Sequence, residues 1–147
     1  MDKQSLKIIS ILLVGLSWGA CKGEVKPGVP VTFQQACQMD GKTVDVEGFV
    51  RFAQHMECRS SNCSVNLYPT DQVTYEIPYR ILTMPVGGGK NKMELPPQKF
   101  TSTDLKIHDR NGQLVGYNNK VRITGYVLGN KTGQDWCQIS VEAIQKL

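Results

Sequence analysis

The chain has 147 residues, of which 40% are hydrophobic and 20% charged, and its formal net charge is +4 at pH 7. This length supports one domain with one modest core, and 14 Gly and 7 Pro suit many short strands joined by turns. The basic residues form no run that would follow a phosphate backbone, so charge gives no argument for a nucleic-acid partner.

The first 20 residues have the features of an export signal. Lys3 and Lys7 precede an apolar run at residues 8–16, and the small residues Ser17, Gly19 and Ala20 follow. This order is typical of a secretory signal peptide. The apolar run is too short to span a bilayer, which needs about 20 residues. We therefore expect residues 1–20 to be a signal peptide.

Cys21 follows Gly19 and Ala20 directly. The arrangement resembles the lipobox of bacterial lipoproteins, in which the new N-terminal cysteine carries lipid. The resemblance implies diacylglyceryl and N-acyl groups, palmitate among them, on Cys21. It also implies an anchor in a membrane of the bacterial cell envelope, with the protein facing the periplasm or the exterior. Trp18 stands where such sequences usually have leucine, so ordinary cleavage after Gly19 or Ala20 is the alternative. Residues 21–30 are then expected to form a flexible tether.

Four further cysteines are Cys37, Cys58, Cys63 and Cys137. An even number in an exported chain indicates disulfides. Cys58 and Cys63 flank a polar turn, so a bond between them would close a local loop, and Cys37 would then pair with Cys137. The other two connectivities stay open.

A metal site is the competing interpretation of the same stretch. His55, Cys58 and Cys63 lie within nine residues, and zinc accepts such ligands. No CxxC is present, however, and an oxidising compartment favours disulfides. We predict no metal and no other cofactor, with this site as an alternative.

The predicted elements begin with a short helix or turn near Thr32, placed to plug one end of a barrel. A long strand follows from residue 43 to about 55, and another covers residues 64–68. Residues 73–84 are rich in strand formers, but Pro78 restricts them to an edge or splits them. Residues 85–99 contain three consecutive Gly and a Pro-Pro pair, and we expect a mobile loop there.

The C-terminal part reads as a series of hairpins. Asn111-Gly112 between alternating segments is a strong hairpin signal. Strands are then expected over residues 120–128 and 136–144, joined by a turn at 129–133. In the last strand, Cys137, Ile139 and Val141 alternate and should face the core.

Two strands share an unusual pattern that suggests how the fold closes. Residues 43–49 and 120–128 alternate apolar and polar side chains, and each places a glycine, Gly48 or Gly125, directly before an aromatic residue. Glycine inside a strand suggests a bulge or the sharp bend at a barrel corner. We therefore expect these strands to be partners that close a small barrel.

The segments GKTVDVEGFV, NKVRITGYVLG and WCQISVEAI resemble those of secreted bacterial OB-fold proteins of the tRNA-anticodon-domain-like kind, over residues 31–147. The resemblance implies an all-β, OB-fold-like antiparallel barrel of five to six strands with a short N-terminal helix. The chain departs from that pattern because it has no clear helix between the third and fourth barrel strands.

These features predict a non-enzymatic binding or scaffolding lipoprotein. OB barrels present their second and third strands to ligands, and aromatic residues interleaved with arginine suit sugar rings or bases. The compartment favours a glycan or protein partner over nucleic acid, and an exported single-stranded nucleic-acid-binding protein is the alternative. The candidate contacts are Phe49, Arg51, Tyr68, Tyr79, Arg80 and Tyr126.

An enzyme is not expected. The sequence has no nucleophile elbow, no zincin signature and no second His beside a nucleophilic Cys. Glu47, Glu57 and Glu76 are the acidic residues that a carboxylate pair would need, but their strand positions fit the surface better. We predict no catalytic residue.

Overall fold

The structure is a computed structural model that describes residues 23–129 and 137–147. The predicted signal peptide, Cys21, Trp136 and most of the predicted turn at 129–133 lie outside the described residues. No helix in the described part of the chain is long and apolar enough to cross a membrane.

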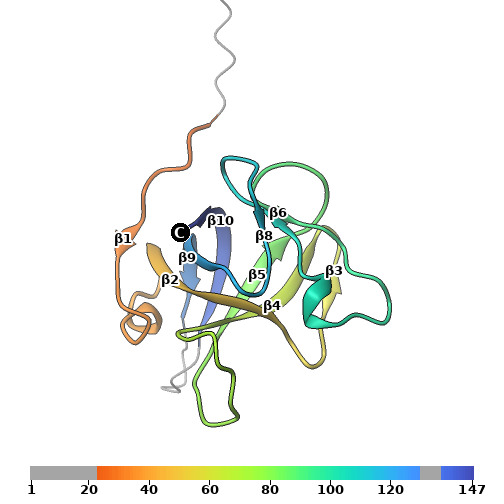
Figure 1. Cartoon of the computed structure of the whole chain (residues 1–147). Coiled ribbons are helices and arrows are strands. Elements are labelled where there is room, and N and C mark those ends of the chain that lie inside the picture. The colour runs from red at the N-terminus through yellow and green to blue at the C-terminus, as the bar shows by residue number, and fades with distance from the viewer. Residues whose placement is uncertain (1–22, 130–136) are drawn as a thin grey trace, which may run out of the picture.

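Strands make up almost all of the regular structure, which confirms the predicted all-β class. The helix expected near Thr32 is reduced to a single 3-10 turn, η1. The elements in chain order are β1 (Val29–Pro30), η1 (Ala36–Gln38), β2 (Thr43–Phe52), β3 (Cys58–Arg59), β4 (Asn62–Tyr68), β5 (Arg80–Pro85), β6 (Lys92–Met93), η2 (Ser102–Asp104), β7 (Ile107–His108), β8 (Leu114–Val115), β9 (Lys120–Leu128) and β10 (Gln138–Lys146) (Figure 1).

Five long strands close into a barrel. Their order is β2-β9-β10-β5-β4, and β4 pairs back onto β2. All neighbours are antiparallel except β5 and β10, which run parallel. The expectation of a wholly antiparallel barrel is therefore wrong at one seam. A closed ring of five strands cannot alternate direction all the way round, so at least one pair must be parallel. The order is that of a small OB-like Greek-key barrel.

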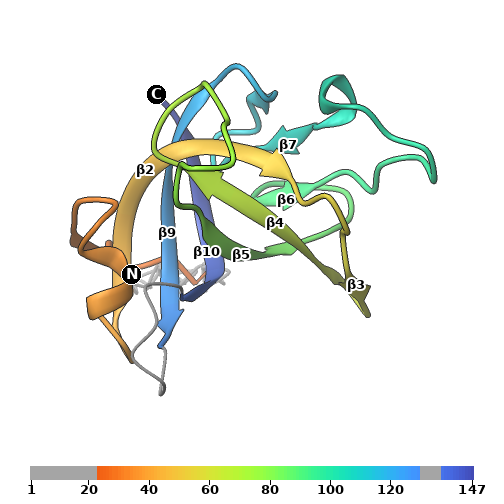
Figure 2. The ribbon, with the colours of Figure 1, turned by 90° about the horizontal axis from the view of Figure 1, so that it is seen from below.

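The predicted closing pair is confirmed, because β2 and β9 are antiparallel neighbours over their whole glycine-containing stretch. The strand β2 is strongly curved (Figure 2), and it pairs with β9 up to Phe49 and with β4 from Phe49 onwards. A Cβ at Gly48 would clash with the Tyr68 carbonyl oxygen. At Gly125, a Cβ would lie 2.6 Å from Ile139 Cγ2 and 2.6 Å from the Ser140 carbonyl oxygen. Both glycines are therefore required by close approach of a neighbouring strand.

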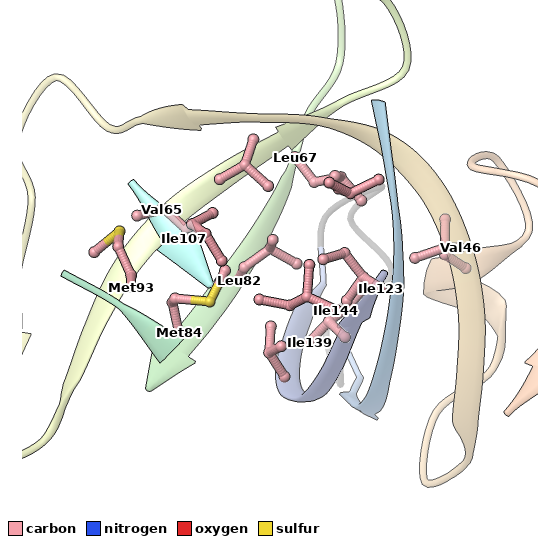
Figure 3. Close-up of a cluster of buried hydrophobic side chains, with 14 of the residues drawn as sticks. Val46, Val65, Leu67, Leu82, Met84, Met93, Ile107, Ile123, Ile139 and Ile144 are labelled. Carbon is pink, nitrogen blue, oxygen red and sulfur yellow. The ribbon is translucent and has the colours of Figure 1, made fainter. Parts of the chain in front are cut away.

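The core fills the barrel with the inward set of each alternating strand. Cys137, Ile139 and Val141 are buried, as predicted. Figure 3 shows how side chains from the barrel strands and from the segment between β5 and β9 converge on one cluster. The labelled members are Val46, Val65, Leu67, Leu82, Met84, Met93, Ile107, Ile123, Ile139 and Ile144.

The segment between β5 and β9 contains a second small sheet, ordered β6-β7-β8. The hairpin expected around Asn111-Gly112 is present, with Asp109 and Gln113 at its ends. The expectation of a mobile loop over residues 85–99 is wrong in part, because β6 lies within it and Met93 is fully buried. This sheet lies between the third and fourth barrel strands, β5 and β9, where the OB-fold pattern has a helix and this sequence predicts none.

Two disulfides join the expected cysteines. Cys37 is bonded to Cys137 and ties η1 to the start of β10, and Cys58 is bonded to Cys63 between β3 and β4. Such bonds persist in oxidising surroundings, which indicates an extracellular or cell-envelope location. The tether expected over residues 21–30 is shorter at its C-terminal end, because Val29 and Pro30 form β1 and pair with β2.

A buried carboxylate fastens the β7–β8 hairpin to the last strand. Asp109 is fully buried, and its carboxylate accepts hydrogen bonds from the backbone N–H groups of Asn111 and Gln113 at 2.8 Å and Lys146 at 3.1 Å. Burial acts to raise the pKa of Asp109, but these backbone donors outweigh it and hold the pKa below its ordinary value. The ionised form is therefore the one that stabilises the fold.

Replacing Asp109 with Asn should lower the free energy of unfolding by about 2 kcal/mol at pH 7, because an ionised acceptor of three bonds is lost. Because the pKa of Asp109 is lower in the folded protein than in the unfolded chain, where it is near 4, the ionised carboxylate stabilises the fold at pH values above about 4. This stabilisation is lost as the pH falls through the pKa of the folded protein. The difference between the two proteins should therefore shrink below about pH 4 in denaturant titrations. Glu142→Gln, on an exposed position of β10, is the control and should show no such trend.

Candidate functional site

A groove with a volume of about 1020 Å³ lies over the outer face of β4 and β5. We call it the main groove. Its walls are the end of β2 with the segment that follows it, residues 52–57, and the irregular segment before β5, residues 73–79. Its floor is formed by the outward side chains of three strands, which are Ser64, Asn66, Tyr68, Ile81 and Gln138.

The main groove is aromatic and polar but nearly uncharged. Three tyrosines line it, Tyr68, Tyr75 and Tyr79, and the ring centroids of Tyr68 and Tyr79 lie 5.5 Å apart. Side-chain amides come from Gln54, Asn66 and Gln138. Among its described lining residues, Glu57 is the only Asp, Glu, Lys or Arg. Such a surface offers ring faces for stacking and amides for hydrogen bonds, without a strong electrostatic field.

A second groove, of about 510 Å³, adjoins the first, and we call it the side groove. It is lined by Arg51, Asp71, Phe100 and Tyr117 among others, and the Phe100 ring lies 4.6 Å from that of Phe52. The two grooves share the lining residues Phe52, Ala53, Gln54, Tyr68 and Val73.

Arg51 is held rigidly in the side groove by backbone carbonyls. Its Nη1 donates to the carbonyl oxygens of Val50 (3.0 Å) and Tyr117, and its Nη2 donates to that of Asp71 (2.9 Å). Its guanidinium carbon also lies 5.6 Å from the ring centroids of Phe49 and Tyr117. Burial lowers the pKa of Arg51, and the charge of Asp71 opposes this effect.

The structure brings together only some of the six predicted contacts. Tyr68 and Tyr79 line the main groove, and Arg51 and Tyr68 line the side groove. Phe49 belongs to the lining of neither groove, and its ring centroid lies 5.6 Å from the guanidinium carbon of Arg51. Tyr126 lies on β9 beside Thr43 and belongs to the lining of neither groove.

Arg80 is placed in the interior. Its side chain is buried, its guanidinium carbon lies 4.5 Å from the Phe33 ring centroid, and Nε and Nη2 donate to the Phe33 carbonyl oxygen at 3.3 and 3.2 Å. Sequence reasoning had set Arg80 on the ligand face. It instead joins β5 to the segment before η1, so its role is structural.

Several groove residues were missed from the sequence. Ser64 and Asn66 alternate with the buried Val65 and Leu67, so the period-two pattern of β4 contained the signal for an outward set. Tyr75, which is fully exposed, comes from an irregular segment without any periodic pattern. No local signal identified that residue.

The metal alternative at His55, Cys58 and Cys63 is contradicted, because the disulfide between the two cysteines removes both thiolates. Within the described residues, no group of three or more His, Cys, Asp or Glu side chains is arranged to hold a metal. Glu47, one of the acidic residues considered for catalysis, forms ion pairs of 2.8 Å with Lys120 and Arg122. Hydrogen bonds from these two cations hold the pKa of Glu47 below its ordinary value.

Comparison with known protein families and with curated proteins gives no match. Among solved structures, a similar chain is described as a "putative aspartyl-tRNA synthetase from Leishmania major Friedlin". The alignment has 10% identity and a TM-score of 0.41, and it covers 85% of this chain and 22% of that one. At this level of similarity the alignment supports no inference about function. The OB-like barrel is identified from the strand order of this chain alone.

Proposed function

We propose that this protein is a non-enzymatic, exported binding module that holds a glycan in the main groove. One observation carries the proposal. The outer face of β4 and β5 is hollowed into a groove of about 1020 Å³ whose lining combines three tyrosines with three side-chain amides. Sugar rings stack their C–H faces on aromatic rings, and their hydroxyls pair with amides, so this lining suits a glycan.

The charge of the main groove argues against the nucleic-acid alternative. A single-stranded nucleic acid needs cations that follow its phosphates beside the aromatic platforms. No Lys or Arg is among the described residues that line the main groove, and its one charged side chain, Glu57, is acidic. A neutral polymer therefore fits this surface better than a polyanion of closely spaced phosphates.

Tyr79→Ala should weaken glycan binding about ten-fold, because one stacking ring is lost from the groove wall. Tyr126→Ala is a matched control, since Tyr126 is 39% exposed against 45% for Tyr79 and lies outside both grooves. Binding would be measured by calorimetry with oligosaccharides found in a glycan screen. Equal losses in both variants, or steeply salt-dependent binding of oligothymidylate in place of glycans, would contradict the proposal.

We also propose that Cys21 carries the lipid anchor that attaches this module to a membrane of the bacterial cell envelope. The support is the sequence of residues 1–21 and the exported character that two disulfides indicate. Expression of the full chain in a bacterial host should yield a mature protein that begins at Cys21 with diacylglyceryl and N-acyl groups. Cys21→Ser should release the protein into the soluble fraction, and mass spectrometry of both proteins checks the result. An unmodified Cys21 would refute the anchor and leave the glycan proposal untouched.

A further inference from the structure

The side groove holds a cation that forms no ion pair within the described part of the chain. Arg51 is absent from the ion pairs of these residues, although the charge of Asp71 acts on it from beyond ion-pair distance. Its three hydrogen-bond acceptors are all backbone carbonyl oxygens, and Asp71 contributes its carbonyl. A fixed, partly buried positive charge of this kind attracts an anion more strongly than a mobile surface lysine does.

Two donors of Arg51 are left for a ligand. A guanidinium has five N–H donors, and the described protein groups accept three hydrogen bonds from Nη1 and Nη2. The remaining donors are Nε–H and one N–H of Nη2. These donors belong to neighbouring nitrogens of one planar group, and a guanidinium can bind the two oxygens of a carboxylate through two such nitrogens.

Aromatic rings shape the space around this cation. The rings of Phe49 and Tyr117 flank the guanidinium, and Phe52, Phe100 and Tyr117 line the side groove. The rings hold the guanidinium plane in place, so little side-chain entropy is lost when a ligand binds. Because five residues line both grooves, one extended ligand can occupy both at once.

We infer that the side groove is a subsite for a carboxylate carried by the glycan, with the Arg51 guanidinium as its binding group. This inference rests on the proposed glycan function and narrows its substrate class to acidic glycans. Sugar rings occupy the main groove by stacking on Tyr79, which is 45% exposed, and an acidic unit at one end reaches Arg51. Asp71 also lines the side groove, and its negative charge weakens the attraction and thereby disfavours polymers with a charge on every unit.

The test compares matched ligands on the unchanged protein. Uronate, sialylated and muramyl oligosaccharides would each be measured beside a counterpart whose carboxyl groups are reduced to alcohols, with oligothymidylate as a further polyanion. We expect the acidic form to bind about ten-fold more tightly than its reduced counterpart, because hydrogen bonds to charged groups are stronger than neutral ones. This comparison needs no variant, so folding does not affect it.

Two substitutions then assign the effect to this groove. Asp71→Asn removes a repulsive charge and keeps the backbone carbonyl that Arg51 uses, so it should tighten binding of acidic glycans about two- to three-fold and leave reduced glycans unchanged. Arg51→Lys keeps a positive charge but loses the planar pair of donors, and should remove most of the preference. Circular dichroism and thermal unfolding would verify that both variants are folded.

The outcomes separate the two proposals. If acidic and reduced glycans bind equally, and Tyr79→Ala still weakens both, the main groove stands as a glycan site and the carboxylate subsite is wrong. Weaker binding of acidic glycans to Asp71→Asn would also overturn the subsite, because it would mean that the Asp71 carboxylate favours binding and does not repel the ligand's acidic group. If no glycan binds, or if oligothymidylate binds best, both proposals fail.

Discussion

Replacing Cys37 and Cys137 together with alanine should lower the free energy of unfolding by about 5 kcal/mol. This disulfide spans 100 positions and joins η1 to the start of β10. Without it the unfolded chain gains the conformational freedom of a loop that contains most of the barrel. Denaturant titrations of the oxidised proteins would measure the loss.

The second disulfide supplies the comparison. Cys58 and Cys63 are only five positions apart, so the same chain-entropy relation gives about 2 kcal/mol for their replacement by alanine. The barrel should remain folded in both cases but with clearly different midpoints. Equal losses would show that stabilisation by the long bond does not come from chain entropy.

Gly125→Ala should destabilise the barrel strongly, with an expected loss of about 3 kcal/mol in the free energy of unfolding. The new methyl group would lie 2.6 Å from Ile139 Cγ2 and 2.6 Å from the Ser140 carbonyl oxygen, both on β10. Since β9 and β10 are paired on either side of this point, the methyl group can be accommodated only if the strands separate. The bulge in β10 between Val141 and Ala143 lies opposite and would be disturbed as well.

Gly88→Ala is the control for this prediction. A Cβ at Gly88 would meet nothing within 4 Å, so the same substitution there removes only the freedom of a loop glycine. We expect its free energy of unfolding to stay within about 1 kcal/mol of the native value. Thermal unfolding with circular dichroism would rank the three proteins, and a Gly125→Ala protein as stable as Gly88→Ala would refute the close-approach explanation.

Local patterns in the sequence predict several features of the fold correctly. Alternation with period two located the long strands, Asn111-Gly112 located a hairpin, and the shared glycine pattern of β2 and β9 identified these two strands as partners. These signals are local because a strand's faces and a turn's backbone angles depend on residues next to each other. The cysteine count and the polar turn between Cys58 and Cys63 similarly anticipated the disulfides.

Contacts between residues far apart in the chain define which polar and aromatic residues line the grooves. Arg51 and Arg80 look alike in the sequence, yet Arg80 is buried against Phe33, 47 positions away, while Arg51 is fixed at the side groove by Tyr117, 66 positions away. The parallel β5–β10 seam and the burial of Met93 likewise depend on barrel closure. These contacts join residues that are far apart in the chain. Alternation of apolar and polar residues shows which side chains share a face of a strand, but it does not show which part of the chain packs against that face.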